Sequence, residues 1–444
     1  MRALCSHHVI TRSLLLLLFI VYIFIYIRSV YISVKSESSL VDTLTVHSPD
    51  VWNMKMLDLV KVSPEKMALL ETYSSRNVVN LSLESKKQLC KRYGFKLLPA
   101  EAPFPRIFYG AMFSKEVDVL HMALYEMIDL LHSYTLVEAN VTFSGEPRAI
   151  RFPSFIKRFV EHRSPGNMTL VDKIVYSIWS QEGKKEYYAS SDSPLPGDKH
   201  YGREEAIRNS IGDVWRDLGM RHSDLAIVSD ADEYISRDFL MALQVCDPFP
   251  MYRKHLIEPG MKQNRCRKTK LMSRSNTYSS YMDCPQQAKY HNQTKVYKGI
   301  RMYWHPDIIP ASCLLDRDAN TTVENLRTRP GSRRLMNKVV GWHYRNIMSP
   351  EDVLKKYRTY GHPSESPPMV RYNVTGGILG LEHIMMERKD DCSLRIQLLK
   401  ETNSSWLEAP LILQRDEYID MFRPLFLNIS EYIEILNYNT RRLS

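Results

Sequence analysis

The chain has 444 residues, with 60 Lys and Arg against 50 Asp and Glu, which gives a formal charge of +10 at neutral pH. Hydrophobic residues make up 44% and charged residues 25%, so a collagen-like chain and a wholly disordered chain are excluded. The length allows two or three domains, or one large catalytic domain with accessory parts. Glycine is scarce at 17 residues, and no Gly-rich phosphate-binding loop of the dinucleotide or P-loop type occurs.

The N-terminal segment predicts a membrane anchor. Leu14–Ile27 is a charge-free apolar run, and about 20 residues become usable if Arg28 snorkels towards the lipid headgroups. A cleavable signal peptide is the alternative, but the apolar run has no small-x-small cleavage site beside it. We therefore expect a cytoplasmic tail at 1–12, a signal anchor at 13–34, and a single-pass type II membrane protein with its bulk in the lumen.

Possible glycosylation sites and cysteines agree with a lumenal body. Six cysteines follow the anchor without any C-x-x-C spacing, so disulfides are favoured over a structural zinc site. Six cysteines allow 15 pairings, and the sequence leaves them open. Eight N-x-[ST] sequons make glycosylation possible; they lie at Asn80, Asn140, Asn167, Asn292, Asn320, Asn373, Asn403 and Asn428.

Beyond the anchor, a polar region precedes a region of alternating strands and helices. Residues 35–103 predict a stem, and a small accessory subdomain around Leu81–Leu98 is an equal alternative. Residues 104–430 would form the catalytic domain and 431–444 a C-terminal tail. Strands alternating with helices of this length predict a mostly parallel sheet with helices on both sides. In chain order we expect a strand at Ile107–Phe113, a helix at Val117–Leu131, strands at Tyr134–Glu138 and Val171–Trp179, a helix at Arg203–Leu218, a strand at Leu225–Val228, a helix at Arg237–Val245, strands at Val296–Trp304 and 339–344, and a helix from the N-cap Ser349 to Gly361.

The triplet Asp230-Ala231-Asp232 is the sharpest local feature. Four apolar residues precede it in a buried-type strand, and open α/β sheets bind ligands where their strands end. Residues i and i+2 of an extended chain point to the same side, so two carboxylates here could hold Mg²⁺ or Mn²⁺ together with diphosphate oxygens. A solvated turn is the competing interpretation of a lone D-x-D triplet. The strand before the triplet and the adjacent Glu233 make the functional interpretation as well supported as the turn.

Two other segments carry polar groups at strand ends. In Gly341-Trp342-His343, the imidazole could supply a further metal ligand or contact a diphosphate, and a structural histidine beside a buried tryptophan is the alternative. The stretch from Glu138 to Arg148 (EANVTFSGEPR) follows a predicted strand, and an ordinary turn is its alternative. A basic loop at 262–274 could attract anionic substrates, and a solvated lumenal loop is its alternative.

These segments together resemble a known family. Glu138–Arg148, Ser229–Glu233 (SDADE) and Gly341–His343 are similar to the stretches E-S-N-x-T-x-x-G-x-P-[RK], D-A-D-E-I-P and G-W-H-C of glycosyltransferase family 17. The resemblance covers roughly residues 104–430, with clear matching only in those islands and near Ala409-Pro410-Leu411. The departures are Ala139 for Ser, Tyr234-Ile235 for Ile-Pro, and Tyr344 for Cys; residues 246–330 show no match.

The resemblance implies a GT-A-like α/β fold, with a nucleotide-sugar-binding mixed sheet flanked by helices. It also implies an inverting, Mn²⁺- or Mg²⁺-dependent transfer from UDP-GlcNAc. We expect a Golgi membrane enzyme that uses a mannose of N-glycans as acceptor and binds no nucleic acid. An inactive, membrane-tethered carbohydrate-binding protein and a related transferase with another donor or acceptor are the alternatives.

Roles for individual residues follow from the motifs and the resemblance together. Asp230, Asp232 and His343 are the expected metal ligands, Glu138 and Asn140 the expected nucleotide contacts. Inversion needs a carboxylate that deprotonates the acceptor hydroxyl. Glu233 is nearest to the metal motif, while other acidic residues stay open as the base; these are Asp307, Asp316 and Glu324.

Overall fold

The computed structural model describes most of the region expected to be catalytic. The described residues are 64–74, 81–180, 201–249, 266, 270–279, 284, 296–297, 300–315, 322–328, 334–336, 338–359 and 421–425. The predicted cytoplasmic tail, anchor and C-terminal tail lie outside them. Among the described residues, no helix has both the length and the apolar character needed to cross a membrane.

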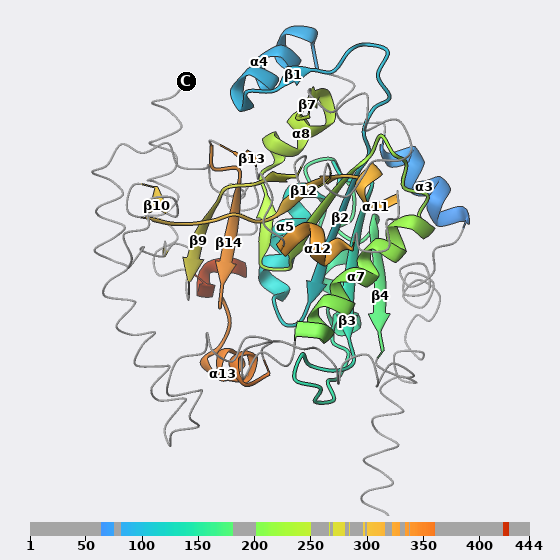
Figure 1. The fold of residues 1–444 in the computed structure, drawn as a ribbon. Helices are drawn as coiled ribbons and strands as arrows, with labels where there is room; N and C mark the ends of the chain where they lie inside the picture. The colour runs from blue at the N-terminus through green and yellow to red at the C-terminus, as the bar shows by residue number, and fades with distance from the viewer. Residues whose placement is uncertain are drawn as a thin grey trace, which may run out of the picture. The chain divides into compact units, whose positions relative to one another are not determined.

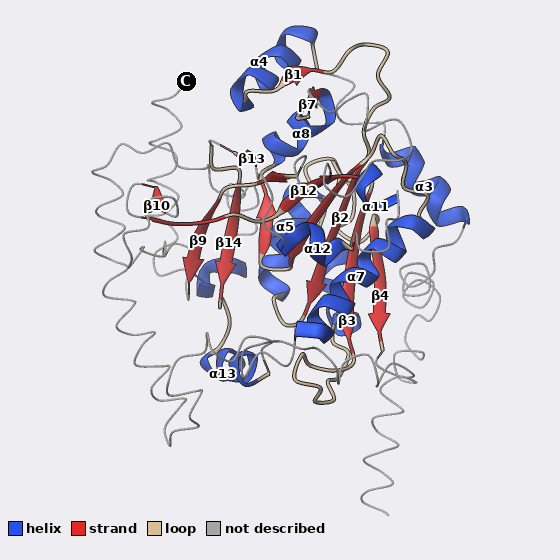
Figure 2. Ribbon diagram, viewed as in Figure 1, coloured by secondary structure: helices blue, strands red, loops and turns tan. Residues whose placement is uncertain are grey.

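A seven-stranded mixed sheet forms the centre of the described fold (Figures 1 and 2). Its strand order is β13-β8-β12-β5-β2-β3-β4, in which β2, β3, β4 and β5 run parallel while β12 is antiparallel to both β5 and β8. The strands are β2 (Ile107–Phe113), β3 (Ser133–Ala139), β4 (Ile174–Trp179), β5 (Leu225–Asp230), β8 (Leu271–Met272), β12 (Asp307–Pro310) and β13 (Arg334–Leu335). The predicted α/β class with a mixed sheet flanked by helices is confirmed.

The order of the parallel strands creates a switch point at their carboxyl ends. From β2 the chain moves outward to β3 and β4, and it then crosses to the other side of β2 to form β5. Such a reversal opens a crevice between the two central strands, where α/β sheets bind ligands. The acidic triplet at the end of β5 therefore lies where this topology places a binding site.

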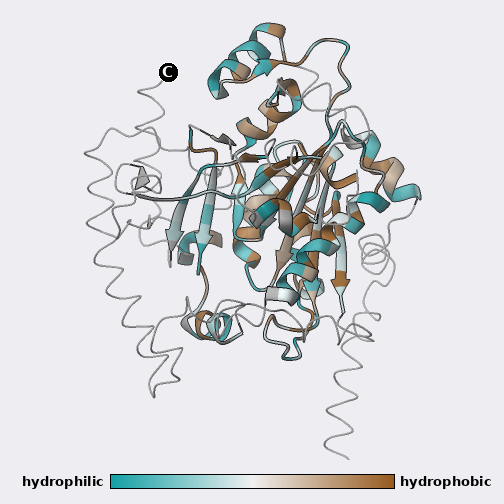
Figure 3. Cartoon of the chain, viewed as in Figure 1, coloured by the Kyte–Doolittle hydropathy of each residue, from teal (hydrophilic) through white to brown (hydrophobic). Residues whose placement is uncertain are grey.

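Helices pack on both faces of the sheet, as the alternation of strand side chains requires. One face packs against α7 (Tyr201–Asp217), α11 (Ser312–Leu315) and α12 (Val323–Thr328) in one apolar cluster. A Cβ at Gly110 would lie 2.3 Å from Ile211 Cγ2, so this glycine permits the close approach of α7 to β2. Figure 3 shows hydrophobic residues along the central strands and hydrophilic stretches on α4 and α7.

The opposite face carries α6 (Phe152–Glu161), which the sequence interpretation missed. Phe152 packs on Phe113 of β2 and Tyr176 of β4, with ring centroids 5.7 and 5.0 Å apart. Phe152, Ile156 and Phe159 are its buried residues. Their i, i+4, i+7 spacing was a visible helical signal.

A second, five-stranded sheet connects the acidic triplet with the Gly-Trp-His segment. Its order is β10-β11-β9-β14-β6, and β14 lies between β9, to which it is parallel, and β6, to which it is antiparallel. The strands are β6 (Glu233–Ile235), β9 (Ser275–Ser279), β10 (Val296–Tyr297), β11 (Ile300–Tyr303) and β14 (Gly341–Arg345). The expected single strand at Val296–Trp304 was wrong, because β10 and β11 pair antiparallel with each other.

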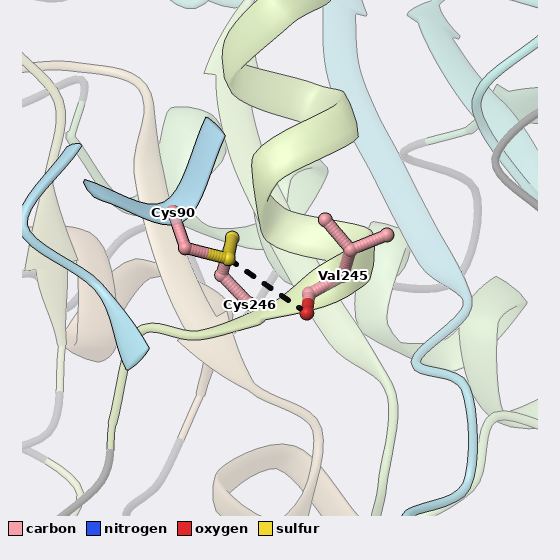
Figure 4. Close-up of a disulfide and its surroundings, with 3 residues drawn as sticks. All are labelled: Cys90, Val245 and Cys246. Atoms are coloured by element: carbon pink, nitrogen blue, oxygen red, sulfur yellow. Dashed lines mark hydrogen bonds between the residues drawn. A yellow bond between two sulfur atoms is a disulfide. The ribbon is translucent and has the colours of Figure 1, made fainter. Parts of the chain in front are cut away.

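The described part of the region predicted as a stem contacts the catalytic body. In α3 (Pro64–Ser74), Leu70 belongs to the same apolar cluster as α7. After α4 (Leu83–Tyr93), β1 (Lys96–Leu97) pairs with β7 (Cys246–Asp247). A disulfide joins Cys90 to Cys246, which follows α8 (Arg237–Val245) (Figure 4). Residues of both described segments thus contact the catalytic body, while the choice between a stem and an accessory subdomain stays a prediction.

A second disulfide joins Cys266 to Cys313, so the expected use of cysteines in disulfides is confirmed for two pairs.

Most predicted elements are present with shifted ends. The helix predicted at Val117–Leu131 is α5 (Val117–Met127), and the strand predicted at Val171–Trp179 begins only at Ile174. The last predicted helix is α13 (Pro350–Arg358), and its N-cap Ser349 accepts a hydrogen bond from the Asp352 backbone N–H at 3.2 Å.

Candidate active site

The acidic triplet begins on a strand and ends in a turn. Strand β5 ends at Asp230, Asp232 lies in the turn that follows, and β6 begins at Glu233. The extended geometry assumed from the sequence therefore stops after the first carboxylate. Asp230 and Asp232 consequently have different surroundings.

Strand pairing brings His343 to this turn from more than 100 residues away in the sequence. In the β14–β6 ladder, His343 is directly opposite Glu233, and the Tyr344 backbone N–H donates to the Asp232 carbonyl at 2.8 Å. A Cβ at Gly341 would lie 2.4 Å from the Tyr234 carbonyl oxygen, so glycine is needed where the two strands approach. The Gly-Trp-His segment thus places its imidazole beside the acidic turn.

Asp232, Glu233 and His343 form a cluster whose possible ligand atoms lie within 4.8 Å of one another. His343 Nε2 is 3.9 Å from Asp232 Oδ1, and the imidazole packs against Tyr303 with ring centroids 4.2 Å apart and the rings tilted by 35°. Carboxylate oxygens with one imidazole nitrogen suit Mn²⁺ and related divalent cations. Two of the three expected metal ligands are therefore together, with Glu233 as a further candidate.

A cavity of about 300 Å³ opens over this cluster. Its walls come from the carboxyl ends of β2, β3 and β5, from β14, and from α7 and α13. Carboxylates and cations face it together. The charged residues among its lining are Lys115, Glu116, Arg148, Arg151, Glu204, Asp230, Asp232, Glu233, Arg345, Lys355 and Lys356.

Asp230 is engaged by two buried arginines. Arg208 of α7 donates to its Oδ1 at 3.2 Å, and Arg327 of α12 donates to its Oδ2 at 3.0 Å. Burial opposes ionisation of Asp230, but Arg327 and Arg208 outweigh it and hold the pKa of this carboxyl well below its ordinary value. Asp230 is therefore ionised and paired with protein cations, so its role as a metal ligand remains a prediction that these contacts do not favour.

Glu233 is buried on the same network, with 1% of its surface exposed. Its carboxylate accepts hydrogen bonds from Arg327 at 3.0 and 3.2 Å and from the Asp230 backbone N–H at 3.1 Å. Burial raises the pKa of Glu233 to about 8, with Arg327 opposing the shift and the carboxylates of Asp230 and Asp232 adding to it. A pKa near neutrality suits a group that exchanges a proton.

His343 is kept neutral by its surroundings. Burial lowers its pKa well below the ordinary value, and the nearby Arg345 and Lys356 add to this effect. A metal binds the neutral imidazole, so the site needs no proton release from His343 before a cation can bind.

The two expected nucleotide contacts, Glu138 and Asn140, lie outside the cavity lining. Glu138 points to the α6 side of the sheet, where it accepts from the Arg151 and Phe152 backbone N–H groups at 2.8 and 3.0 Å and from the Tyr176 hydroxyl at 2.7 Å. The Glu138 carboxylate therefore provides hydrogen-bond acceptors for free backbone N–H groups at the N-terminus of α6. Asn140 Nδ2 donates to Ser180 Oγ at 3.4 Å. Their contact with a nucleotide stays a prediction, which this placement does not support.

The other base candidates are also outside the lining. Asp307 is fully buried; its Oδ2 forms a hydrogen bond with His305 Nδ1 at 2.6 Å, and its Oδ1 forms an ion pair with Lys270 Nζ at 3.2 Å. Glu324 forms an ion pair with Arg208, and Asp316 lies outside the described residues. Among the candidates that the structure describes, Glu233 alone lines the cavity.

Sequence reasoning missed the cations around the cluster. Arg208 had a visible signal, because Glu204 precedes it by one helical turn and the two form an ion pair at 2.8 Å. Arg327 and Lys356 had none, since only tertiary packing brings α12 and α13 to the acidic turn.

Comparison with known proteins decides the family. The model of "Glycosyltransferase family 17" matches residues 11–257, more than half of the chain. The chain belongs to glycosyltransferase family 17. The match includes the motifs at Glu138–Arg148 and Ser229–Glu233, while Gly341–His343 lies beyond it. The family resemblance is thereby confirmed, and the chain is that of a glycosyltransferase.

Relatives of known activity match a smaller part of the chain. The β-1,4-mannosyl-glycoprotein 4-β-N-acetylglucosaminyltransferases of Rattus norvegicus and Homo sapiens are each 24% identical over 156 residues. The match covers 34% of this chain and 26% of each relative, about a quarter of their length. A solved mannosyltransferase from Pyrobaculum calidifontis, in complex with GDP-Man and Mn²⁺, aligns over 84% of this chain and 96% of its own at 10% identity. Its TM-score is 0.23, so this likeness carries no argument about fold or ligands.

Proposed function

We propose that this protein transfers GlcNAc from UDP-GlcNAc to a mannose of N-glycans, with inversion at the sugar and with a divalent cation. The observation that carries the proposal is the convergence of Asp232, Glu233 and His343 on a cavity at the switch point of the sheet. Membership of glycosyltransferase family 17 and the names of the partial relatives support the choice of donor and acceptor.

The side chains fit a resident cation such as Mn²⁺ or Mg²⁺. Asp232 and His343 would hold it, since their nearest ligand atoms are 3.9 Å apart and the imidazole is neutral. When bound, the cation compensates the charge that develops on the departing nucleoside diphosphate. The basic residues of the cavity would add positive charge around the same diphosphate.

Glu233 is our proposed proton acceptor. The ionised form of Glu233 would take the proton of the acceptor hydroxyl as the new glycosidic bond forms, and a raised pKa makes that form a stronger base. Arg327 positions it, because one guanidinium holds both the carboxylate of Glu233 and that of Asp230.

We also propose that the enzyme is a single-pass type II protein of the Golgi membrane. The proposal rests on the apolar segment at 13–34 and on the sequons that follow it. Protection of an N-terminal epitope tag from external protease in sealed Golgi vesicles would contradict it, because the tail should be cytoplasmic.

A donor-by-acceptor screen tests the function. Purified full-length protein in detergent is incubated with a panel of UDP-sugars and mannose-terminated N-glycans, in Mn²⁺ or in EDTA, and the linkage of the product is determined. We expect transfer from UDP-GlcNAc that depends on Mn²⁺. Transfer from another sugar would identify a related transferase, and glycan binding without release of UDP from any donor would identify an inactive carbohydrate-binding protein.

A further inference from the structure

Lys356 of α13 contacts the proposed cation ligand directly. Its Nζ lies 3.4 Å from Asp232 Oδ2 and 3.3 Å from Glu116 Oε1, and both carboxylates line the cavity. About 24% of the Lys356 side chain is exposed. The ammonium group thus occupies a position between the acidic cluster and the open cavity.

The helix that carries Lys356 is tied to the site at several points. Ser349 caps its first turn, and Asp352 forms an ion pair with Lys115, which follows β2. Asn346 Nδ2, just after β14, donates to the Tyr357 hydroxyl at 2.9 Å. These contacts fix α13 next to the acidic turn, so the proximity of Lys356 to Asp232 follows from the packing of the helix.

Two other cations of the cavity wall are held by protein groups away from the cluster. Arg148 donates to the Ala139 carbonyl and to Ser114 Oγ, both at 3.0 Å, and thereby links the ends of β2 and β3. Lys115 is paired with Asp352 of α13. Lys356 differs from them, because one of its ion-pair partners is itself a proposed cation ligand.

A cation on Asp232 and the ammonium of Lys356 would repel each other, since both would then share one carboxylate. A nucleoside diphosphate removes the conflict, because its oxygens accept charge-assisted hydrogen bonds from an ammonium group. A lysine side chain is long enough and flexible enough to move between such partners.

We propose that Lys356 is an exchangeable counter-ion of the donor site. It neutralises Asp232 while no cation is bound, and it donates to the diphosphate of the nucleotide sugar once cation and nucleotide bind together. The proposal rests on the function proposed above and assigns Lys356 as a positioning and binding residue for the donor.

Exchange predicts opposite changes in two affinities, which ordinary structural damage does not produce. In Lys356→Met, binding of Mn²⁺ alone should become tighter, by about threefold to tenfold, because a competing positive charge is gone. Binding of UDP in saturating Mn²⁺ should become weaker by about tenfold or more, the size of one charge-assisted hydrogen bond. Lys356→Arg should restore most of the UDP affinity. Both affinities are measured on the full-length protein by titration calorimetry.

The matched control is Lys157→Met on α6. Lys157 forms an exposed ion pair with Glu161 and does not line the cavity, so its loss removes one positive charge without touching the site. Neither affinity should change in that variant. Equal melting temperatures would verify that the variants are folded.

Three results would overturn the proposal in distinguishable ways. A fall of both affinities in Lys356→Met would show that Lys356 only supports the structure. Unchanged UDP affinity in that variant, with normal UDP binding by the wild type, would refute the diphosphate contact alone. A wild type that binds no UDP in Mn²⁺ would refute the proposed function together with this contact.

Discussion

Replacement of Arg327 by methionine should destabilise the fold strongly. The guanidinium is 4% exposed and holds two carboxylates, Asp230 at 3.0 Å and Glu233 at 3.0 and 3.2 Å, while also donating to the Val228 carbonyl at 3.3 Å. Methionine has a similar length but no charge. Arg327→Met therefore removes the cation shared by the buried Glu233 and the partly exposed Asp230, and of the two arginines bonded to Asp230 it leaves Arg208.

The expected loss follows from the burial of this network. Removing one partner of a buried ion pair costs about 3–5 kcal/mol, because the remaining charge stays buried without compensation. An exposed pair contributes about 0–1 kcal/mol. Arg92 and Asp238 form such a pair, with side chains 55% and 46% exposed, so Arg92→Met is the matched control.

Urea unfolding of the purified variants, followed by fluorescence, measures the difference. With an m-value on the order of 3 kcal/mol/M, the midpoint of Arg327→Met should fall by about 1 M or more, and that of Arg92→Met by about 0.3 M or less. Adding Asp230→Asn to Arg327→Met should recover part of the loss, because the pKa of Asp230 lies well below its ordinary value and its carboxylate is the charge that Arg327 compensates. Equal midpoints for Arg327→Met and Arg92→Met would refute the argument from burial.

Other positions give independent tests. His343→Gln should weaken Mn²⁺ binding by about 10- to 100-fold with little change in melting temperature, whereas a drop in melting temperature at unchanged Mn²⁺ affinity would show a structural histidine. Burial, with Arg106 and Lys173 adding, lowers the pKa of His132 to about 3, so below pH 6.5 the unfolded chain takes up a proton that the folded protein does not. Between pH 6.5 and pH 5, the unfolding free energy should therefore fall by about 1.5–2 kcal/mol more in the wild type than in His132→Gln. Urea unfolding at both pH values measures this, and an equal fall of the unfolding free energy in the two proteins would contradict it. Peptide mapping should find a glycan on the exposed Asn167 and none on the partly buried Asn140, whose amide donates to Ser180; the reverse occupancy would contradict these placements.

The parts of the fold with local signals could be predicted from the sequence. Apolar runs indicated β2, β3 and β5, and helical spacing indicated α5 and α7. The N-cap Ser349 indicated where α13 begins, because the capping pattern lies within one helical turn. The pairing of β14 with β6 could not be predicted, since it joins segments far apart and depends on the sheet as a whole.

The candidate site could likewise be predicted only where the sequence carries a local signal. The sequence located Asp232 and His343, because both belong to recognisable motifs at strand ends. It misjudged the surroundings of Asp230 and Glu138, since strand alternation sends them to opposite faces of the sheet, towards α7 and α12 in one case and α6 in the other. Lys356 was outside any motif and became visible only through packing.

The transfer of GlcNAc as a function of Mn²⁺ concentration, measured for the wild type and for Asp232→Asn, tests the central claim most directly. Asparagine keeps the shape of the side chain but removes the charge that would hold the cation. We predict that the wild type transfers GlcNAc only when Mn²⁺ is present, and that Asp232→Asn melts at the same temperature but is slower by about 10²–10³ at saturating Mn²⁺. Wild-type transfer that persists in EDTA, or a folded Asp232→Asn protein with an unchanged rate, would contradict the account.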